Sequence, residues 1–244
     1  MEKTCTALWR DPASSPDDVA EHLRRTVVPH LSQSALVRGA TLHLEASDEA
    51  YAAFRVGSGR DGRLLSALVS VWTDSYHDTA PLQELLDATP GAEVATYLVS
   101  ESVPTAYGDA MTWAEGEPSP GLSIVTMLDK PEGTDEKTFF HYWHELHRIT
   151  TAQCHPFQSY VRNEVARPLT DGAPRFRGIV TEASPDVQDF LDPHRFYVSG
   201  GTKEQLRANQ RRVVDETSVF IDYTTIQVTP MHENVLRRLA PTSP

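Results

Sequence analysis

A histidine flanked by aromatic residues is the strongest chemical feature of this 244-residue sequence. Phe139, Trp143 and His147 recur at intervals of four, so a helix over this stretch places their side chains on one face. The aromatic neighbours indicate that this face is buried, and burial favours the neutral imidazole. A neutral imidazole in an apolar pocket can act as a general base near neutral pH. The alternative is a buried structural histidine that binds a backbone carbonyl.

Two residues of the strand expected over 157–165 offer complementary chemistry. Tyr160 and Arg162 share one face of that strand with Glu164. If this face lines a pocket, the Tyr160 hydroxyl could donate to a developing oxyanion, and Arg162 could bind a substrate carboxylate. If the face is turned to solvent, Tyr160 is an ordinary strand aromatic and Arg162 is a surface cation.

Weaker signals surround this pair. Asp222 precedes the last predicted strand, where it could orient the ring of His147 or cap a turn. His141, His144 and His147 form an HxxHxxH run, but the first and third do not share a helix face. One ion therefore cannot be bound by all three. Either neighbouring pair could bind an ion only with further ligands from elsewhere, so we predict no metal site. His155 is expected in the loop that follows this helix.

Motifs for common cofactors are absent from the sequence. It contains no Gly-rich phosphate loop, GxGxxG, HExxH or GxSxG pattern, so nicotinamide, ATP and α/β-hydrolase chemistry are not supported. We therefore expect no cofactor.

Composition narrows the class of protein. With 39% hydrophobic and 23% charged residues, the chain can form a globular core. Its net charge of −12 repels phosphate backbones, so we expect no nucleic-acid partner. The N-terminus lacks an apolar signal region, and no run of about 18 apolar residues occurs, so we predict a cytoplasmic protein without a membrane partner. Cys5 and Cys154, without zinc-type spacing, fit that reducing compartment.

The elements that must position the candidate residues occur in a repeated order. The first half reads as strand, helix, two strands, helix and strand, and the second half repeats this order after a Pro- and Gly-rich junction at 118–121. The expected strands cover 4–9, 38–46, 64–72, 93–100, 121–128, 157–165, 175–182 and 223–229. Six helices are expected. The first begins at Ser15, the second covers 81–88, and the third covers 135–153 with Thr134 as its cap. A short helix follows Ser184, another begins at Thr202, and a short helix within 231–244 ends the chain.

This order predicts an α+β fold made of two tandem ferredoxin-like βαββαβ units, 1–110 and 119–230, followed by a tail at 231–244. Each unit leaves one sheet face uncovered, so the two units are expected to pack sheet to sheet as one intramolecular α/β barrel. Because this pairing is internal, a homodimer is optional.

The second half resembles the EthD-like family of the dimeric α/β-barrel superfamily. That family places a Trp four residues before a His on its first helix and a Tyr near the start of its second strand, as Trp143, His147 and Tyr160 do here. The resemblance rests on FHYWHELH at 140–147, YVRN at 160–163, FRGIV at 176–180 and FID at 220–222. The first half matches only in element order. Aligning the starts of the second strands, Arg38 with Phe157, shifts the halves by 157 − 38 = 119 residues and puts Val28 opposite His147, so the first half lacks this histidine. One working pocket and one mainly structural half are therefore expected.

The resemblance implies three functions, because the family and its relatives include decarboxylases, dehydratases, cyclases, cofactor-independent monooxygenases and accessory proteins. The first is a cofactor-free lyase, cyclase or dehydratase in which His147 removes a proton beside a carbonyl or phenol and Tyr160 stabilises the oxyanion. The second is a monooxygenase in which dioxygen attacks the same carbanion. The third is a non-catalytic protein that holds a small hydrophobic metabolite. The residues expected around the substrate are Trp143, Phe139, Arg162 and Asp222.

Overall fold

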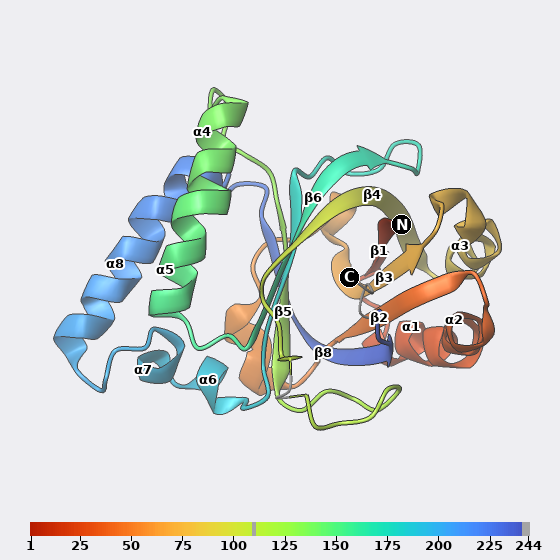
Figure 1. Ribbon diagram of the computed structural model, residues 1–244, viewed down its shortest axis with the longest axis horizontal. Coiled ribbons are helices and arrows are strands. Elements are labelled where there is room, and N and C mark those ends of the chain that lie inside the picture. Colours follow the sequence, from red (N-terminus) through yellow and green to blue (C-terminus); the bar gives the residue numbers. More distant parts are fainter. Residues whose placement is uncertain (109–110, 241–244) are drawn as a thin grey trace.

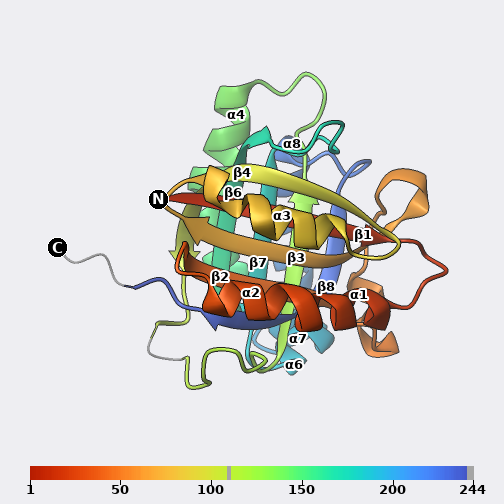
Figure 2. The same ribbon diagram turned by 90° about the vertical axis from the view of Figure 1, so that its right-hand side faces the viewer.

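A closed antiparallel barrel is the frame of the molecule (Figures 1 and 2). The structure is a computed structural model that describes residues 1–108 and 111–240. Around the barrel the strands follow the order β1-β3-β2-β8-β5-β7-β6-β4, and β4 pairs with β1 to close the wall. The α+β class and the barrel predicted from element order are confirmed.

Each half of the chain supplies one continuous half of the wall. The first contributes β1 (Glu2–Arg10), β2 (Val37–Glu45), β3 (Leu64–Thr73) and β4 (Ala92–Thr105) in the order β4-β1-β3-β2. The second contributes β5 (Leu122–Leu128), β6 (Ser159–Pro168), β7 (Gly178–Ser184) and β8 (Gln227–Arg237) in the order β8-β5-β7-β6. The halves meet at two seams, β2 with β8 and β4 with β6.

Helices cover the outside of both half-walls (Figure 1). The first half carries α1 (Pro16–His22), a π-helical segment (Leu23–Val27), α2 (Val28–Gln33) and α3 (Ala80–Asp87), with 3₁₀ turns at Glu49–Phe54, Arg60–Gly62 and Tyr76–Thr79. The second carries α4 (Glu136–Phe140), a π-helical segment (His141–Leu146), α5 (His147–Cys154), α6 (Gln188–Leu191), α7 (Pro193–Phe196) and α8 (Lys203–Phe220). None of the helices within residues 1–108 and 111–240 has both the length and the apolar character needed to cross a membrane.

Helix starts follow local capping chemistry. The Ser15 hydroxyl accepts from the amide of Asp17 at 3.2 Å, and Thr202 caps α8 by accepting from the amide of Gln205 at 3.2 Å. Asp135 caps α4, whereas the sequence predicted Thr134 as the cap. The helix expected over 135–153 is present, but a π-helical segment interrupts it.

The prediction of a C-terminal helix within 231–244 is wrong for residues 231–237, which form a strand. Met231–Arg237 continue β8, where Asn234 pairs with Leu42 of β2 and Met231 pairs with Ser123 of β5. Beyond Met231 the other side of β8 meets the segment before β5, where the amides of Ser119 and Gly116 donate to the carbonyls of Glu233 and Val235. These contacts and the pairing with β2 satisfy backbone groups and override the helical pattern. Residues 241–244 lie outside the part of the chain that the structure describes.

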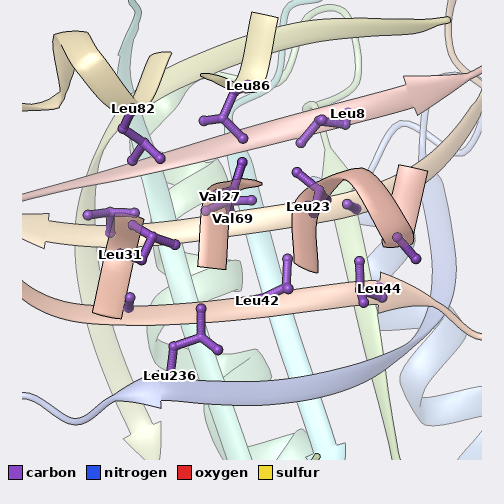
Figure 3. Packing of buried hydrophobic residues seen from close by; sticks show 14 of the residues in the cluster. Leu8, Leu23, Val27, Leu31, Leu42, Leu44, Val69, Leu82, Leu86 and Leu236 are labelled. Carbon is purple, nitrogen blue, oxygen red and sulfur yellow. The ribbon is translucent and has the colours of Figure 1, made fainter. Parts of the chain in front are cut away.

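The two outer faces of the barrel are filled differently. Under α1, α2 and α3, leucine and valine side chains from helices and strands point toward one another and form a hydrophobic cluster (Figure 3). Burial of each Leu side chain stabilises the folded state by about 1.5–3 kcal/mol compared with its exposure to water. Under α4, α5 and α8, an aromatic cluster around Phe139, Trp143 and Phe220 covers the sheet beside a cavity. The second half is therefore the one that offers a site.

Candidate functional site

A cavity of about 210 Å³ lies between the outer face of the second half-wall and its helices. Its floor comes from neighbouring strands, with Tyr160 on β6, Val180 and Glu182 on β7, Thr126 on β5 and Val228 on β8. Its roof and sides include residues of the π-helical segment 141–146, of the helices α5, α7 and α8, and of the loops that follow these helices. These are Trp143, His147, His155, Phe157, Phe196, Tyr197, Val213, Thr217, Ile221 and Tyr223. The structure therefore brings His147, Trp143 and Tyr160 to one cavity.

His147 begins α5 and is paired with a carboxylate. Its Nδ1 lies 2.8 Å from Oε1 of Glu216 on α8, and the Thr150 hydroxyl donates to the other carboxylate oxygen at 2.6 Å. Burial raises the pKa of Glu216, but the bonds from His147 and Thr150 outweigh burial and lower it overall. An ionised carboxylate only accepts hydrogen bonds, so Nδ1 carries the proton. In the neutral imidazole Nε2 is then the nitrogen that can accept from a ligand.

Asp222 does not orient His147. Its carboxylate accepts from the amide of Thr224 at 2.9 Å and from the Thr224 hydroxyl at 2.6 Å. These bonds lower the pKa of Asp222 and make it the cap of a turn, which was the alternative role. Glu216 takes the orienting position. Glu216 was not predicted from the sequence, because it lies in a strongly polar helix where single carboxylates do not stand out.

Tyr160 and Glu182 stand side by side on the cavity floor. They are directly paired residues of β6 and β7, so their side chains lie on the same face of the sheet. Burial is the main cause that raises the pKa of the Tyr160 hydroxyl, so this group stays protonated. Burial also raises the pKa of Glu182 from 4.5 to about 8. Glu182 is half-buried, and its exposed part borders the cavity.

Glu182 should make stability fall with rising pH. Between about pH 4.5 and 8 the folded protein keeps a proton that the unfolded chain releases, so the free energy of unfolding falls by about 1.4 kcal/mol per pH unit. The variant Glu182→Gln should lose this slope, whereas Glu145→Gln on the exposed helix surface should keep it. Urea unfolding of the three proteins at several pH values measures the slopes. Parallel slopes for wild type and Glu182→Gln would show that Glu182 ionises normally.

His155 caps the C-terminal end of α5 and lines the cavity, although the sequence predicted only a loop residue. Its ring stacks on Phe157 with centroids 5.0 Å apart, and its Nδ1 donates to the carbonyl of Phe196 at 3.0 Å. Burial lowers the pKa of His155 to about 4. Such an imidazole stays neutral and is a weak base, so His147 is the better candidate for proton abstraction.

Arg162 supports the wall of the site instead of lining the cavity. Its guanidinium donates to the carbonyls of Trp143 and His144, both at 3.1 Å, and to the Ser102 hydroxyl at 3.1 Å. The two carbonyls belong to the π-helical segment, where the regular helical bonds are interrupted. Because Arg162 does not border this cavity, it is not placed to bind a substrate carboxylate there. Its role is to hold the segment that carries Trp143.

Phe139 also lies behind the cavity wall. It is fully buried, with its ring centroid 5.3 Å from that of Trp143 and 6.3 Å from that of Phe220. It is absent from the residues that border the cavity. The helical spacing therefore placed Phe139 on the correct face, but the cavity begins one turn further along.

Gly178 makes room for Trp143. A Cβ atom at this position would overlap the far edge of the indole ring. We expect Gly178→Ala to destabilise the fold by about 1–3 kcal/mol, because overpacking forces the ring or the strand to move. In a Trp143→Phe background the same change should cost less, since the smaller ring leaves space. Urea unfolding of the four proteins tests this, and an equal cost in both backgrounds would exclude the indole as the cause.

The other histidines of the HxxHxxH run are separated by environment. His141 contacts Glu145 at 3.0 Å on the surface. Burial, helped by the charge of Arg162, lowers the pKa of His144 to about 4. Within the described part of the chain, no group of three or more His, Cys, Asp or Glu side chains is arranged to hold a metal ion.

A larger groove of about 600 Å³ lies between α3 and the connection that follows β6. Arg167 donates to the Tyr76 hydroxyl across it at 2.7 Å, and its histidine, His77, is exposed. This groove is open to solvent and lacks a paired imidazole and carboxylate. The smaller cavity beside His147 is therefore the better candidate for chemistry.

Comparisons with known proteins agree on the fold. No protein-family model matches this chain, and no curated protein matches it. The structure of an anthrone oxidase-like protein superposes with a TM-score of 0.56 at 12% identity, covering 100% of this chain and 97% of the other. A candidate monooxygenase from Lactobacillus acidophilus NCFM superposes with a TM-score of 0.51 at 12% identity, covering 97% and 98%. At these identities the likeness shows a shared fold alone.

Proposed function

We propose that this cavity binds a small hydrophobic or aromatic carbonyl compound or phenol and that His147 removes a proton from it as a general base. The observation that carries the proposal is the His147–Glu216 pair at 2.8 Å on the wall of a largely aromatic cavity. At about 210 Å³ the cavity is somewhat larger than the roughly 150 Å³ cavity known to take up benzene. A ligand of one or two rings fits this size.

The proposed step uses only groups of this chain. Nε2 of His147 takes a proton from a C–H beside the carbonyl, or from a phenol O–H, and the freed electron pair moves onto the oxygen. The ionised Glu216 stabilises the imidazolium that forms, as a carboxylate does for histidine bases in general. Trp143, Phe157 and Phe196 provide the apolar surface that holds an aromatic ring. Loss of a leaving group or ring closure would then complete a lyase, dehydratase or cyclase reaction.

Oxygenation of the same carbanion is the second candidate. It is favoured by the two similar structures, which carry the descriptions of an anthrone oxidase-like protein and a monooxygenase. In this reaction dioxygen adds to the carbanion of a CH₂ group, and the resulting hydroperoxide loses water to leave a carbonyl. Both candidates share proton abstraction by His147 as the first step.

Exchange of the ligand's acidic C–H protons for deuterium tests proton abstraction by itself, whatever reaction follows. One- and two-ring aryl ketones with acidic C–H bonds are incubated with the protein in D₂O, and exchange is followed by NMR beside an oxygen electrode. Exchange faster than in buffer supports the general base, and accompanying oxygen uptake selects the oxygenase. Ligand binding without exchange for every ketone would instead indicate a non-catalytic binding protein.

We also infer that the halves are tandem ferredoxin-like units, 1–110 and 119–230. Their half-walls share one strand order, β4-β1-β3-β2 and β8-β5-β7-β6. Each unit also carries a π-helical segment in its first helix, at 23–27 and 141–146. The starts of these segments differ by 141 − 23 = 118 residues and their ends by 146 − 27 = 119. Membership of the second half in the EthD-like family stays a prediction.

A further inference from the structure

Glu182 is an acidic side chain on the cavity floor without a partner. In the described part of the chain no side chain or backbone N–H donates a hydrogen bond to its carboxyl group, and no cation lies among its neighbours in the cavity lining. Glu182 is half-buried, and its exposed part borders the cavity. A carboxyl group withdrawn from bulk water without a hydrogen-bond partner costs free energy. A group retained at this cost, facing a cavity, points to a ligand that supplies the missing partner.

We propose that the carboxyl group of Glu182 binds the oxygen atom of the substrate on which negative charge develops, so that the cavity selects aromatic ketones and phenols by their oxygen. This inference rests on the function proposed above and names a second residue for it. His147 approaches the ligand from the helix layer and Glu182 from the sheet. The two groups therefore contact different parts of the ligand.

The chemistry requires Glu182 to be a hydrogen-bond donor. A carboxylate would repel an enolate or phenolate, whereas a protonated carboxyl donates to it in a bond assisted by the ligand charge. The raised pKa of about 8, caused by burial, keeps the proton on Glu182 at neutral pH. A carboxylic acid kept neutral by an apolar site is an effective oxyanion donor because its surroundings need no reorganisation.

Tyr160 is less suited to this role than the sequence suggested. Its hydroxyl has polar neighbours on the helix side, Thr151 and Trp143, which both act to lower its pKa. Glu182 has no such competitors. The other titratable groups that border the cavity come from the helix layer, from β6 and from the loops, and they are His147, His155, Tyr160, Tyr197 and Tyr223.

Binding of a stable phenolate tests the inference without turnover. The probe is 2,4-dinitrophenol, which is ionised throughout neutral and alkaline pH, and the matched ligand is 1,3-dinitrobenzene, which lacks the phenol oxygen. By calorimetry at pH 7, Glu182→Met should weaken binding of the phenolate about tenfold or more and leave the dinitrobenzene affinity unchanged. Glu182→Gln keeps a donor and should retain the phenolate affinity within about threefold. Glu145→Met, on the helix surface, should change neither affinity.

The pH dependence separates a donor from a merely structural residue. Above about pH 8 the wild-type affinity for the phenolate should fall, by up to about tenfold per pH unit, as Glu182 ionises. Glu182→Gln should not show this additional fall. Equal losses for both ligands in Glu182→Met, identical pH profiles for wild type and Glu182→Gln, or no phenolate binding by the wild type would each overturn the inference. Exchange that still depends on His147 would then leave the proposed function standing.

Discussion

Replacing His147 by alanine should lower the rate at which the protein catalyses hydrogen–deuterium exchange of the aryl ketones by about 10²–10⁴-fold, the usual contribution of a general base. The reason is geometric and electrostatic. His147 borders the cavity with Nε2 free, while Glu216 at 2.8 Å holds Nδ1 and stabilises the imidazolium produced by proton transfer. His155, the other imidazole at the cavity, has a pKa of about 4 and cannot replace this base efficiently.

The matched control is His141→Ala. His141 lies on the same helical stretch, but it is exposed and contacts Glu145 at the surface. Its replacement should leave the exchange rate within about twofold of the wild-type rate, as expected for an ordinary surface substitution. The measurement is the initial exchange rate by NMR at one pH, with circular dichroism as the check of folding. A His147→Ala protein that is folded and exchanges at the wild-type rate would remove His147 from the reaction.

Replacing Arg162 by methionine should lower the free energy of unfolding by about 2–4 kcal/mol. Methionine keeps most of the apolar volume but removes the donors that satisfy the carbonyls of Trp143 and His144 and the Ser102 hydroxyl. Each buried acceptor left without a partner costs about 1–3 kcal/mol, and water that enters the site recovers part of this. Urea unfolding at constant pH measures the difference.

Arg148→Met provides the comparison for this second prediction. Arg148 is an exposed arginine near the start of α5, so its replacement should change stability by no more than about 0.5 kcal/mol. Arg162→Met should in addition weaken binding of aromatic ligands, because the π-helical segment held by Arg162 carries Trp143. Equal free energies of unfolding for the two variants would show that the hydrogen bonds from Arg162 to the π-helical segment make no net contribution to stability.

The barrel could be predicted from the sequence because strand and helix patterns mostly agree with the tertiary structure. Leu64–Thr73 is an apolar run, and Leu42 and Leu44 alternate with polar residues in β2, as their pairing requires. The exception is Met231–Arg237, whose composition favours a helix. There the pairing with β2 decides the conformation, and a local pattern carries no information about that pairing.

The candidate site was only partly predictable for the same physical reason. Helical spacing brought Trp143 and His147 together because the interaction is local along one helix. Glu216 and Glu182 come from elements 69 and 35 residues further along the chain, by the arithmetic 216 − 147 and 182 − 147. In the sequence, a charged residue within an exposed helix or an alternating strand indicates a side chain that faces solvent. Only the register of β6 against β7 reveals that Glu182 stands beside Tyr160.

The two seams that close the barrel have a thermodynamic consequence. Strands β2 and β8, and β4 and β6, join within one chain, so the pairing is an intramolecular event at an effective concentration set by the 16-residue connection 106–121 between β4 and β5. A barrel assembled from two separate chains would lose stability on dilution by mass action. The midpoint of unfolding of this protein should therefore be independent of protein concentration.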